Sequence, residues 1–208
     1  MRYIEKGCSP PFFEQFKNDF VKLNNKSATY ADITKKDEYY DLKFHILNEQ
    51  FGLCCYCMKE IDMNDNTCHI EHFIPQSIEP RKAMDYDNLL VSCDGFYNNR
   101  ENCGHKKGNW YSEFYTISPL APDCELLFKY NINGNIMPEN DNDLRAKETI
   151  NNLDLDSHLL QRARKRAIFC ALKEVDERKQ QIINEYSNPC EGRLPAFCLA
   201  VLYVIKNI

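Results

Sequence analysis

The chain has 208 residues, of which 43% are hydrophobic and 27% are charged, so it can bury a core and is not expected to be disordered. The formal net charge is −5, from 26 basic and 31 acidic residues, which excludes coating of nucleic acid by bulk positive charge. No apolar run reaches the roughly 18 residues of a membrane span. The first residues also lack the apolar segment of a signal peptide. We therefore expect a cytoplasmic protein.

The first 52 residues are predicted to be helical. Two consecutive prolines open a segment in which apolar side chains recur at helical spacing as far as Leu23. A second helix is expected from Lys36 to Phe51, with Gly52 at its end. We interpret the aromatic residues of both segments as core rather than as a surface for stacking bases.

The last third of the chain is predicted to contain a hairpin and further helices. Asn133-Gly134 between two short apolar runs indicates a β-hairpin. A helix capped by Asp156 and Ser157 is expected to reach Tyr186, with an apolar stripe along it. After a break rich in Pro and Gly, residues 196–205 predict an apolar terminal helix, which is either core or a docking surface.

Cysteine content indicates a metal site. The chain has 11 cysteines, and most of them lie between residues 54 and 103. A reducing compartment disfavours disulfides, so clustered thiols indicate metal binding, whereas the scattered ones are interpreted as small buried hydrophobes. The C-x-x-C pair Cys54 and Cys57, with Cys93 and Cys103, predicts a closed Cys₄ site for structural Zn²⁺. Cys55 and Cys68 are the substitutes if this assignment is wrong.

A set of motifs lies between and after these thiol pairs. Residues 68–75 read Cys-His-Ile-Glu-His-Phe-Ile-Pro, residues 87–89 read Asp-Asn-Leu, and residues 104–109 read Gly-His-Lys-Lys-Gly-Asn. In this order, and together with the C-x-x-C, they resemble the HNH endonucleases, the ββα-metal nucleases. The resemblance covers residues 54–109.

The resemblance implies an α+β fold, with a zinc-stapled ββα-metal core embedded in a mostly helical frame. It implies metal-dependent hydrolysis of phosphodiester bonds in DNA or RNA. His72 is then the general base, Glu71 and His105 bind the catalytic metal, and Asn88 hydrogen-bonds the loop that holds His72. Three segments are expected in one compact unit: an N-terminal helical segment (1–52), the nuclease core (53–118), and a hairpin with a C-terminal helical segment (119–208).

Elementary chemistry supports the same residue types. An imidazole that titrates near neutral pH suits the activation of water. A carboxylate and an imidazole suit a divalent ion that leaves positions open for phosphate and water. Mg²⁺ or Mn²⁺ is expected, and Ni²⁺ or Zn²⁺ is also compatible with these ligands. His69 shares a strand face with Glu71, and Asn109 follows His105 by one helical turn, so both are reserve ligands.

The flanking sequences resemble the PtuB-type HNH proteins of Septu antiphage systems and of retron-linked relatives. This resemblance implies an effector nuclease of antiviral defence that acts with a PtuA-like ATPase. In retron-linked members it also implies a reverse transcriptase and its RNA–DNA product as partners.

Local basic residues are the candidates for binding nucleic acid. Lys106 and Lys107 adjoin the predicted site. Arg162, Arg164, Lys165 and Arg166 form a basic stretch in the predicted long helix, where each phosphate contact adds to the salt dependence of binding. The alternatives are a solvated helix face or a surface for an acidic partner.

Two rival functions are weighed. His69-Ile70-Glu71 is the H-x-E of zinc deaminases, but the P-C-x-x-C that should follow it is missing. A non-catalytic zinc-binding interaction module explains the cysteines, but it leaves the ordered histidines, Glu71 and Asn88 without a role.

Overall fold

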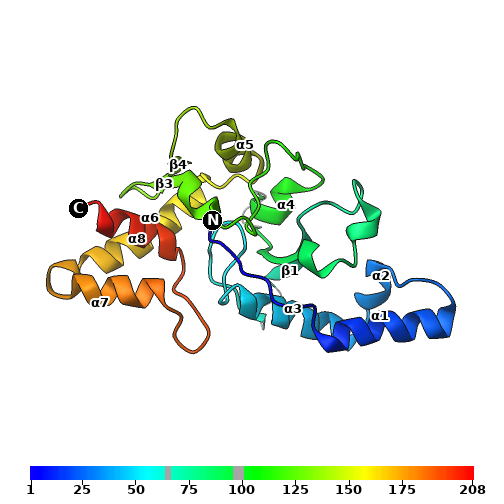
Figure 1. Cartoon of the computed structure of the whole chain (residues 1–208). Coiled ribbons are helices and arrows are strands. Elements are labelled where there is room, and N and C mark those ends of the chain that lie inside the picture. The colour runs from blue at the N-terminus through cyan, green and yellow to red at the C-terminus, as the bar shows by residue number, and fades with distance from the viewer. Residues whose placement is uncertain (64–66, 96–100) are drawn as a thin grey trace.

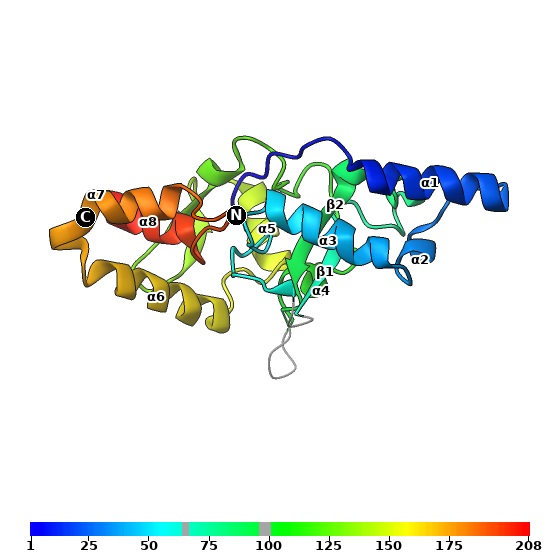
Figure 2. The same cartoon turned by 90° about the horizontal axis from the view of Figure 1, so that it is seen from below.

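Two short strands and a helix form the centre of the chain. The computed structural model describes residues 1–63, 67–95 and 101–208. Strand β1 (Cys68–His72) pairs with β2 (Leu89–Cys93) in an antiparallel sheet, and α4 (Cys103–Lys107) follows. Figures 1 and 2 both show this unit between a helical N-terminal end and a helical C-terminal end. The predicted α+β class is confirmed, with helices dominating and only small sheets.

The register of β1 and β2 sets the two faces of the central sheet. Cys68 lies opposite Cys93, and His72 lies opposite Leu89. Because successive side chains of a strand point to opposite faces, His69 and Glu71 share one face while His72 points to the other. The loop between the strands contains two 3₁₀ turns, η2 (Pro80–Lys82) and η3 (Tyr86–Asn88).

The two helices predicted for the N-terminal segment are confirmed, and a short, unpredicted helical turn lies between them. They are α1 (Pro11–Asn24), the single turn α2 (Tyr30–Ile33) and α3 (Asp37–Glu49). Helix α3 contacts β2 and buries Leu42, Ile46 and Leu47. At its end, Gly52 adopts a φ of +75° and donates its N–H to the Leu47 carbonyl at 3.0 Å, a conformation that favours glycine.

The predicted hairpin is also confirmed. After the 3₁₀ turn η4 (Cys124–Leu127), β3 (Phe128–Tyr130) pairs with β4 (Ile136–Pro138). Gly134 in the connecting turn has a φ of +83°, and a Cβ there would lie 2.1 Å from the Gln161 carbonyl oxygen. Only glycine fits this turn, which is pressed against the helix that begins at His158.

The predicted helix from residue 156 to Tyr186 is wrong. The chain forms α6 (His158–Leu172) and α7 (Val175–Ser187), which are separated by a turn at residues 173–174. Both helices contact α8 (Cys198–Lys206), and a straight helix could not cover α8 on two sides. A further helix, α5 (Leu144–Asn152), precedes them. Ser157 occupies the N-cap position of α6, but its side chain makes no cap bond.

Helix α8 belongs to the core. Most of its side chains are buried by the chain itself: Cys198, Ala200, Val201, Leu202, Val204 and Ile205. An amphipathic surface helix would leave a polar face in water, whereas this helix is apolar on nearly all sides. The described residues therefore favour core over docking surface. No described helix is both long enough and apolar enough to cross a bilayer.

The predicted basic stretch on α6 contains one buried residue and three exposed residues. Arg164 is only 2% exposed, and its guanidinium donates to the carbonyls of Leu155 and Leu160. A phosphate cannot reach it, so the predicted phosphate contact of Arg164 is wrong. Arg162, Lys165 and Arg166 are exposed, and Lys165 donates to Asn133 Oδ1 at 3.1 Å.

Replacing Arg164 by Met should lower the free energy of unfolding by about 1–3 kcal/mol, because two buried carbonyls lose their donor. Arg162→Met on the exposed side of α6 is the matched control and should change it by less than about 0.5 kcal/mol. Urea unfolding followed by circular dichroism measures both. Equal free energies for the two variants would show that Arg164 has no structural role.

Candidate functional site

Four buried cysteines meet where three segments of the chain converge. Cys54 and Cys57 lie in the turn after α3, Cys93 ends β2, and Cys103 begins α4. Their sulfur atoms all lie within 4.8 Å of one another, and the sulfurs of Cys57 and Cys93 are 3.8 Å apart. Four ligands at the Zn–S distance of about 2.3 Å in a tetrahedron are about 3.8 Å apart. This cluster consists of the four predicted cysteines and can hold zinc.

Two backbone N–H groups point to sulfur atoms of this cluster. The N–H of Cys93 points to Cys54 Sγ at 3.3 Å, and the N–H of Lys59 points to Cys57 Sγ at 3.4 Å. Such donors stabilise thiolates, which are the form that binds metal. The two substitutes, Cys55 and Cys68, are not among the four in the described part of the chain.

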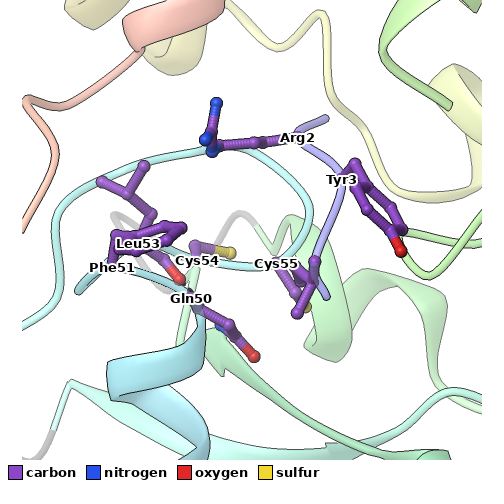
Figure 3. A pocket seen from close by; sticks show the side chains of 8 residues that line it. Arg2, Tyr3, Gln50, Phe51, Leu53, Cys54 and Cys55 are labelled. Atoms are coloured by element: carbon purple, nitrogen blue, oxygen red, sulfur yellow. Dashed lines mark hydrogen bonds between the residues drawn. The ribbon is translucent and has the colours of Figure 1, made fainter. Parts of the chain in front are cut away.

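Gln50 anchors the cysteine turn to the central sheet. Its side-chain amide donates to the carbonyls of Leu53 and Val91 at 2.7 and 2.8 Å, and its oxygen accepts the N–H of Val91 at 2.7 Å. Figure 3 shows Gln50, Cys54 and Cys55 at a small pocket that Arg2 and Tyr3 also line. Burial raises the pKa of the Cys55 thiol well above its usual value, so Cys55 stays a neutral thiol.

A second group of side chains that could hold a metal ion comes from β1, α4 and the residue after β2. His69 on β1, Asp94 just after β2 and His105 on α4 offer ligand atoms within 4.8 Å of one another. Asp94 Oδ1 lies 3.0 Å from His69 Nδ1 and 3.6 Å from His105 Nε2. All three side chains are partly exposed, so this group is open to solvent, unlike the cysteine cluster.

Glu71 is buried beside this group and is held by three partners. Its Oε1 accepts from Lys107 Nζ at 2.6 Å and from the Tyr56 hydroxyl at 3.1 Å, and its Oε2 lies 3.4 Å from His69 Nε2. Burial raises the pKa of the Glu71 carboxyl, but His69 and Lys107 outweigh it and hold that pKa below its usual value. Glu71 is therefore a carboxylate.

Two carboxylates raise the pKa of the His69 imidazole. Burial lowers the pKa of its imidazole, but the carboxylates of Glu71 and Asp94 more than offset burial and raise that pKa above its usual value. A site that favours positive charge on or beside His69 also suits a bound cation.

His72 lies on the opposite face of β1 and is nearly buried. Its Nε2 lies 3.0 Å from the Ala83 carbonyl, which can only accept, so Nε2 carries the proton. The Tyr30 ring and the imidazole pack edge to face, with centroids 4.4 Å apart. Burial lowers the pKa of His72, which keeps the ring neutral and leaves Nδ1 as a proton acceptor.

Asn88 ties the loop after β1 together. Its Oδ1 accepts the N–H of Ile74 at 2.7 Å, and its amide donates to the carbonyls of Ile74 and Lys82 at 3.0 and 3.1 Å. These bonds fix the loop that carries Ala83, the partner of His72. The side chain thus makes the kind of loop contacts that the sequence analysis expects.

The group that the structure brings together differs from the predicted pair of metal ligands, Glu71 and His105. It contains His105 together with His69, the reserve ligand, and with Asp94, which the sequence analysis missed. Asp94 directly follows Cys93, whose register partner Cys68 directly precedes His69, so strand pairing was the signal that could have found it. Asn109, the other reserve ligand, is exposed.

Lys107 is not available to nucleic acid. Its side chain is 1% exposed, and its ammonium donates to Glu71 and, at 2.9 Å, to the His72 carbonyl. The predicted phosphate contact of Lys107 is therefore wrong, because helix α4 turns this residue inward. Lys106, its neighbour, is exposed.

Comparison with known proteins supports the predicted resemblance. No family model matches the chain. The chain is 27% identical over 160 residues to "Septu protein PtuB" of Bacillus thuringiensis, covering 75% of this chain and 55% of that protein. It is 29% identical over 103 residues to "Retron Ec83 putative HNH endonuclease" of Escherichia coli, covering 46% of this chain and 38% of that protein. The similarity to both is distant, and the chain spans about half the length of these curated relatives or less.

The cysteine cluster predicts tightly bound zinc. The purified chain should carry about one zinc ion in the cluster, and Cys57→Ser should lose it, because a closed site needs all four thiolates. The thermal midpoint should fall by roughly 10 °C or more, since each kcal/mol lost corresponds to about 2–4 °C in a chain of this size. Elemental analysis and calorimetry measure both. Cys170→Ser, at an exposed cysteine of α6, is the control and should change neither.

Proposed function

We propose that the chain is a metal-dependent HNH endonuclease that hydrolyses phosphodiester bonds of nucleic acid, as the effector nuclease of an antiphage defence system. The observation that carries the proposal is which ring nitrogen of His72 carries the proton. This histidine has one nitrogen tied to a backbone carbonyl and the other left as an acceptor, and it follows directly after the carboxylate of Glu71. The distant similarity to a putative HNH endonuclease and to a Septu protein supports the same function.

His72 has the properties of a general base. The Ala83 carbonyl fixes the neutral tautomer with the proton on Nε2, so the lone pair of Nδ1 is free to take a proton from water. The Gln76 amide donates to Nδ1 over a long distance of 3.4 Å, which confirms Nδ1 as the acceptor, and a substrate water would have to replace this weak bond. The Asn88 bonds keep the Ala83 loop, and hence the ring, in place.

The residues of the second group, together with the neighbouring Glu71, fit a catalytic divalent ion. The carboxylates of Glu71 and Asp94 and the imidazoles of His69 and His105 supply oxygen and nitrogen donors of the kind that bind Mg²⁺, Mn²⁺, Ni²⁺ or Zn²⁺. When bound, such an ion stabilises the charge that develops on the scissile phosphate and its leaving oxygen. Glu71 and His105 are the ligands that the family resemblance assigns, and His69 and Asp94 lie beside them.

Nucleic acid is proposed to bind along α4 and α6. Asp94 and Ala163 of α6 line one cavity, so α6 runs past the metal-binding group. Lys106 on α4 and Arg162, Lys165 and Arg166 on α6 are exposed and can contact phosphates, which makes binding dependent on salt. Arg164 and Lys107 have structural roles instead.

The partners follow from the systems named for the two relatives. A Septu protein and a retron protein each imply further components of a defence system, and we propose a PtuA-like ATPase for this chain. A reverse transcriptase with its RNA–DNA product is the corresponding proposal for a retron context. A nuclease held by such a partner would spare its own cell until infection.

Replacing His72 by Ala should reduce cleavage by about 10² or more, the scale of a lost general base, while zinc content and fold are retained. Cleavage of plasmid DNA and of RNA across a panel of divalent metals, with and without the proposed ATPase, is the measurement. His158→Ala, at an exposed histidine of α6, is the matched control and should cleave like the parent.

Two outcomes would contradict the proposal. Equal cleavage by His72→Ala and the parent would exclude His72 as the base. The absence of hydrolysis by the parent with every substrate, metal and partner would favour the rival function, a non-catalytic zinc-binding module that uses only the cysteine cluster.

A further inference from the structure

A cavity of about 450 Å³ adjoins the group formed by His69, Asp94 and His105. Asp94 belongs to both, because its carboxylate contacts His69 at 3.0 Å and the residue also lines the cavity. Pockets that bind small molecules typically measure about 300–1,000 Å³ and combine apolar walls with a few polar groups. The size and the position of this cavity therefore suit a part of the substrate that lies next to the cleaved bond.

The apolar wall of the cavity comes from the C-terminal helices. Leu159, Leu160 and Ala163 lie on one side of α6, three and four residues apart. Phe197, the residue before α8, completes the wall, and its backbone N–H is fixed by the Met58 carbonyl at 2.8 Å. A flat apolar group that enters the cavity leaves water, and the burial of its surface favours binding.

The cavity also contains polar groups. Asp94 contributes a carboxylate and Asn102 a side-chain amide, and Asn102 is only 7% exposed. Carboxylates and amides are the groups that hydrogen-bond the edges of nucleobases. A nucleobase has two apolar faces and a polar edge, so it matches an apolar wall with these polar groups better than a hydrocarbon does.

Basic side chains lie around the cavity. Lys59 lines it and is exposed. Arg162 and Arg166 are exposed on α6 and follow Leu159 and Ala163 by three residues, which places each of them beside the apolar wall. Positive charge around an apolar cavity is complementary to a nucleotide, in which an anionic phosphate is joined to a flat base.

We infer that the cavity takes an unpaired nucleobase of the substrate strand, while Lys59, Arg162 and Arg166 contact the neighbouring phosphates. A base inside a duplex is stacked and paired, so it must be extruded before it can enter such a cavity. The substrate class is therefore nucleic acid with an unpaired base next to the cleaved bond, as in a single strand. The inference deepens the proposed function and rests on it only in placing the cleaved phosphate beside Asp94.

A competing arrangement leaves the cavity unused. The basic side chains alone would hold the strand through its phosphates, as they would hold any polyanion. Binding would then depend on salt but not on the presence of bases. A strand with the same phosphates and no bases separates the two arrangements.

The test is the binding of fluorescently labelled strands to the 208-residue chain with zinc present, measured by anisotropy. A short single strand is compared with a fully abasic strand of the same length and with a duplex of the same sequence. The intact single strand should bind about 5-fold or more tightly than the other two, the factor that corresponds to about 1 kcal/mol for one stacked base.

Filling the cavity should remove this preference. Ala163→Trp should weaken binding of the intact single strand by about 5-fold or more and should leave binding of the abasic strand unchanged, because the phosphate contacts remain. Cys170→Trp is the matched control, since it adds the same side chain at an exposed position two turns further along α6. Cys170 is not among the described residues that line the cavity, and this variant should bind both strands like the parent.

The outcomes separate the inference from the proposed function. Equal affinities of the parent for intact and abasic strands would overturn the inference, and so would parental binding of the intact strand by Ala163→Trp. If Ala163→Trp does not fold, Ala163→Leu makes a smaller addition to the same wall, and the comparison of strands on the parent needs no variant. Binding as inferred without any cleavage would reject the nuclease function, whereas cleavage with binding that ignores the bases would reject only the inference.

Discussion

The geometry of the cysteine cluster determines where the other candidate site residues lie. Cys93 ends β2 and is followed by Asp94, while Cys103 begins α4 and is followed by Gly104 and His105. Sulfurs that must converge on one point therefore fix the start of α4 against the end of β2. This junction also sets the geometry of the His69, Asp94 and His105 group, so an ion in the cysteine cluster would affect the candidate site through position rather than through chemistry. Small metal-organised folds commonly depend on the ion in this way.

Strand β1 uses its two faces for two different tasks. One face carries His69 and Glu71 beside Asp94 and His105, and the other presents His72 to the Ala83 carbonyl and the Tyr30 ring. Lys107 links the two faces, because its ammonium bonds both the Glu71 carboxylate and the His72 carbonyl. A buried ion pair of this kind is weak evidence for stability, since desolvation offsets much of the attraction. Its contribution is orientation: it fixes one oxygen of Glu71 and the backbone beside the proposed base.

The packing of the C-terminal helices determines which basic side chains are exposed to a substrate. Helix α6 packs against α8, so residues on that side must be apolar or fully hydrogen-bonded, and Arg164 meets the second condition through two backbone carbonyls. The exposed basic side chains of α6 then remain on the outer surface, while Leu159, Leu160 and Ala163 of the same helix line a cavity with Asp94. A chain of net charge −5 can present a local basic surface in this way.

The sequence by itself determined helices α1 and α3, the hairpin and the four cysteines of the cluster, because periodicity, Asn-Gly turns and thiol spacing are local signals. It also identified the HNH-like motif, which the distant relatives support. It could not identify Asp94, the burial of Lys107 and Arg164, or the break between α6 and α7. Each of these depends on which segments pack together: strand register brings Asp94 to His69, and the need to cover α8 bends the chain after α6. Contacts between distant residues are set by tertiary packing, which leaves no signal in the spacing along a single chain.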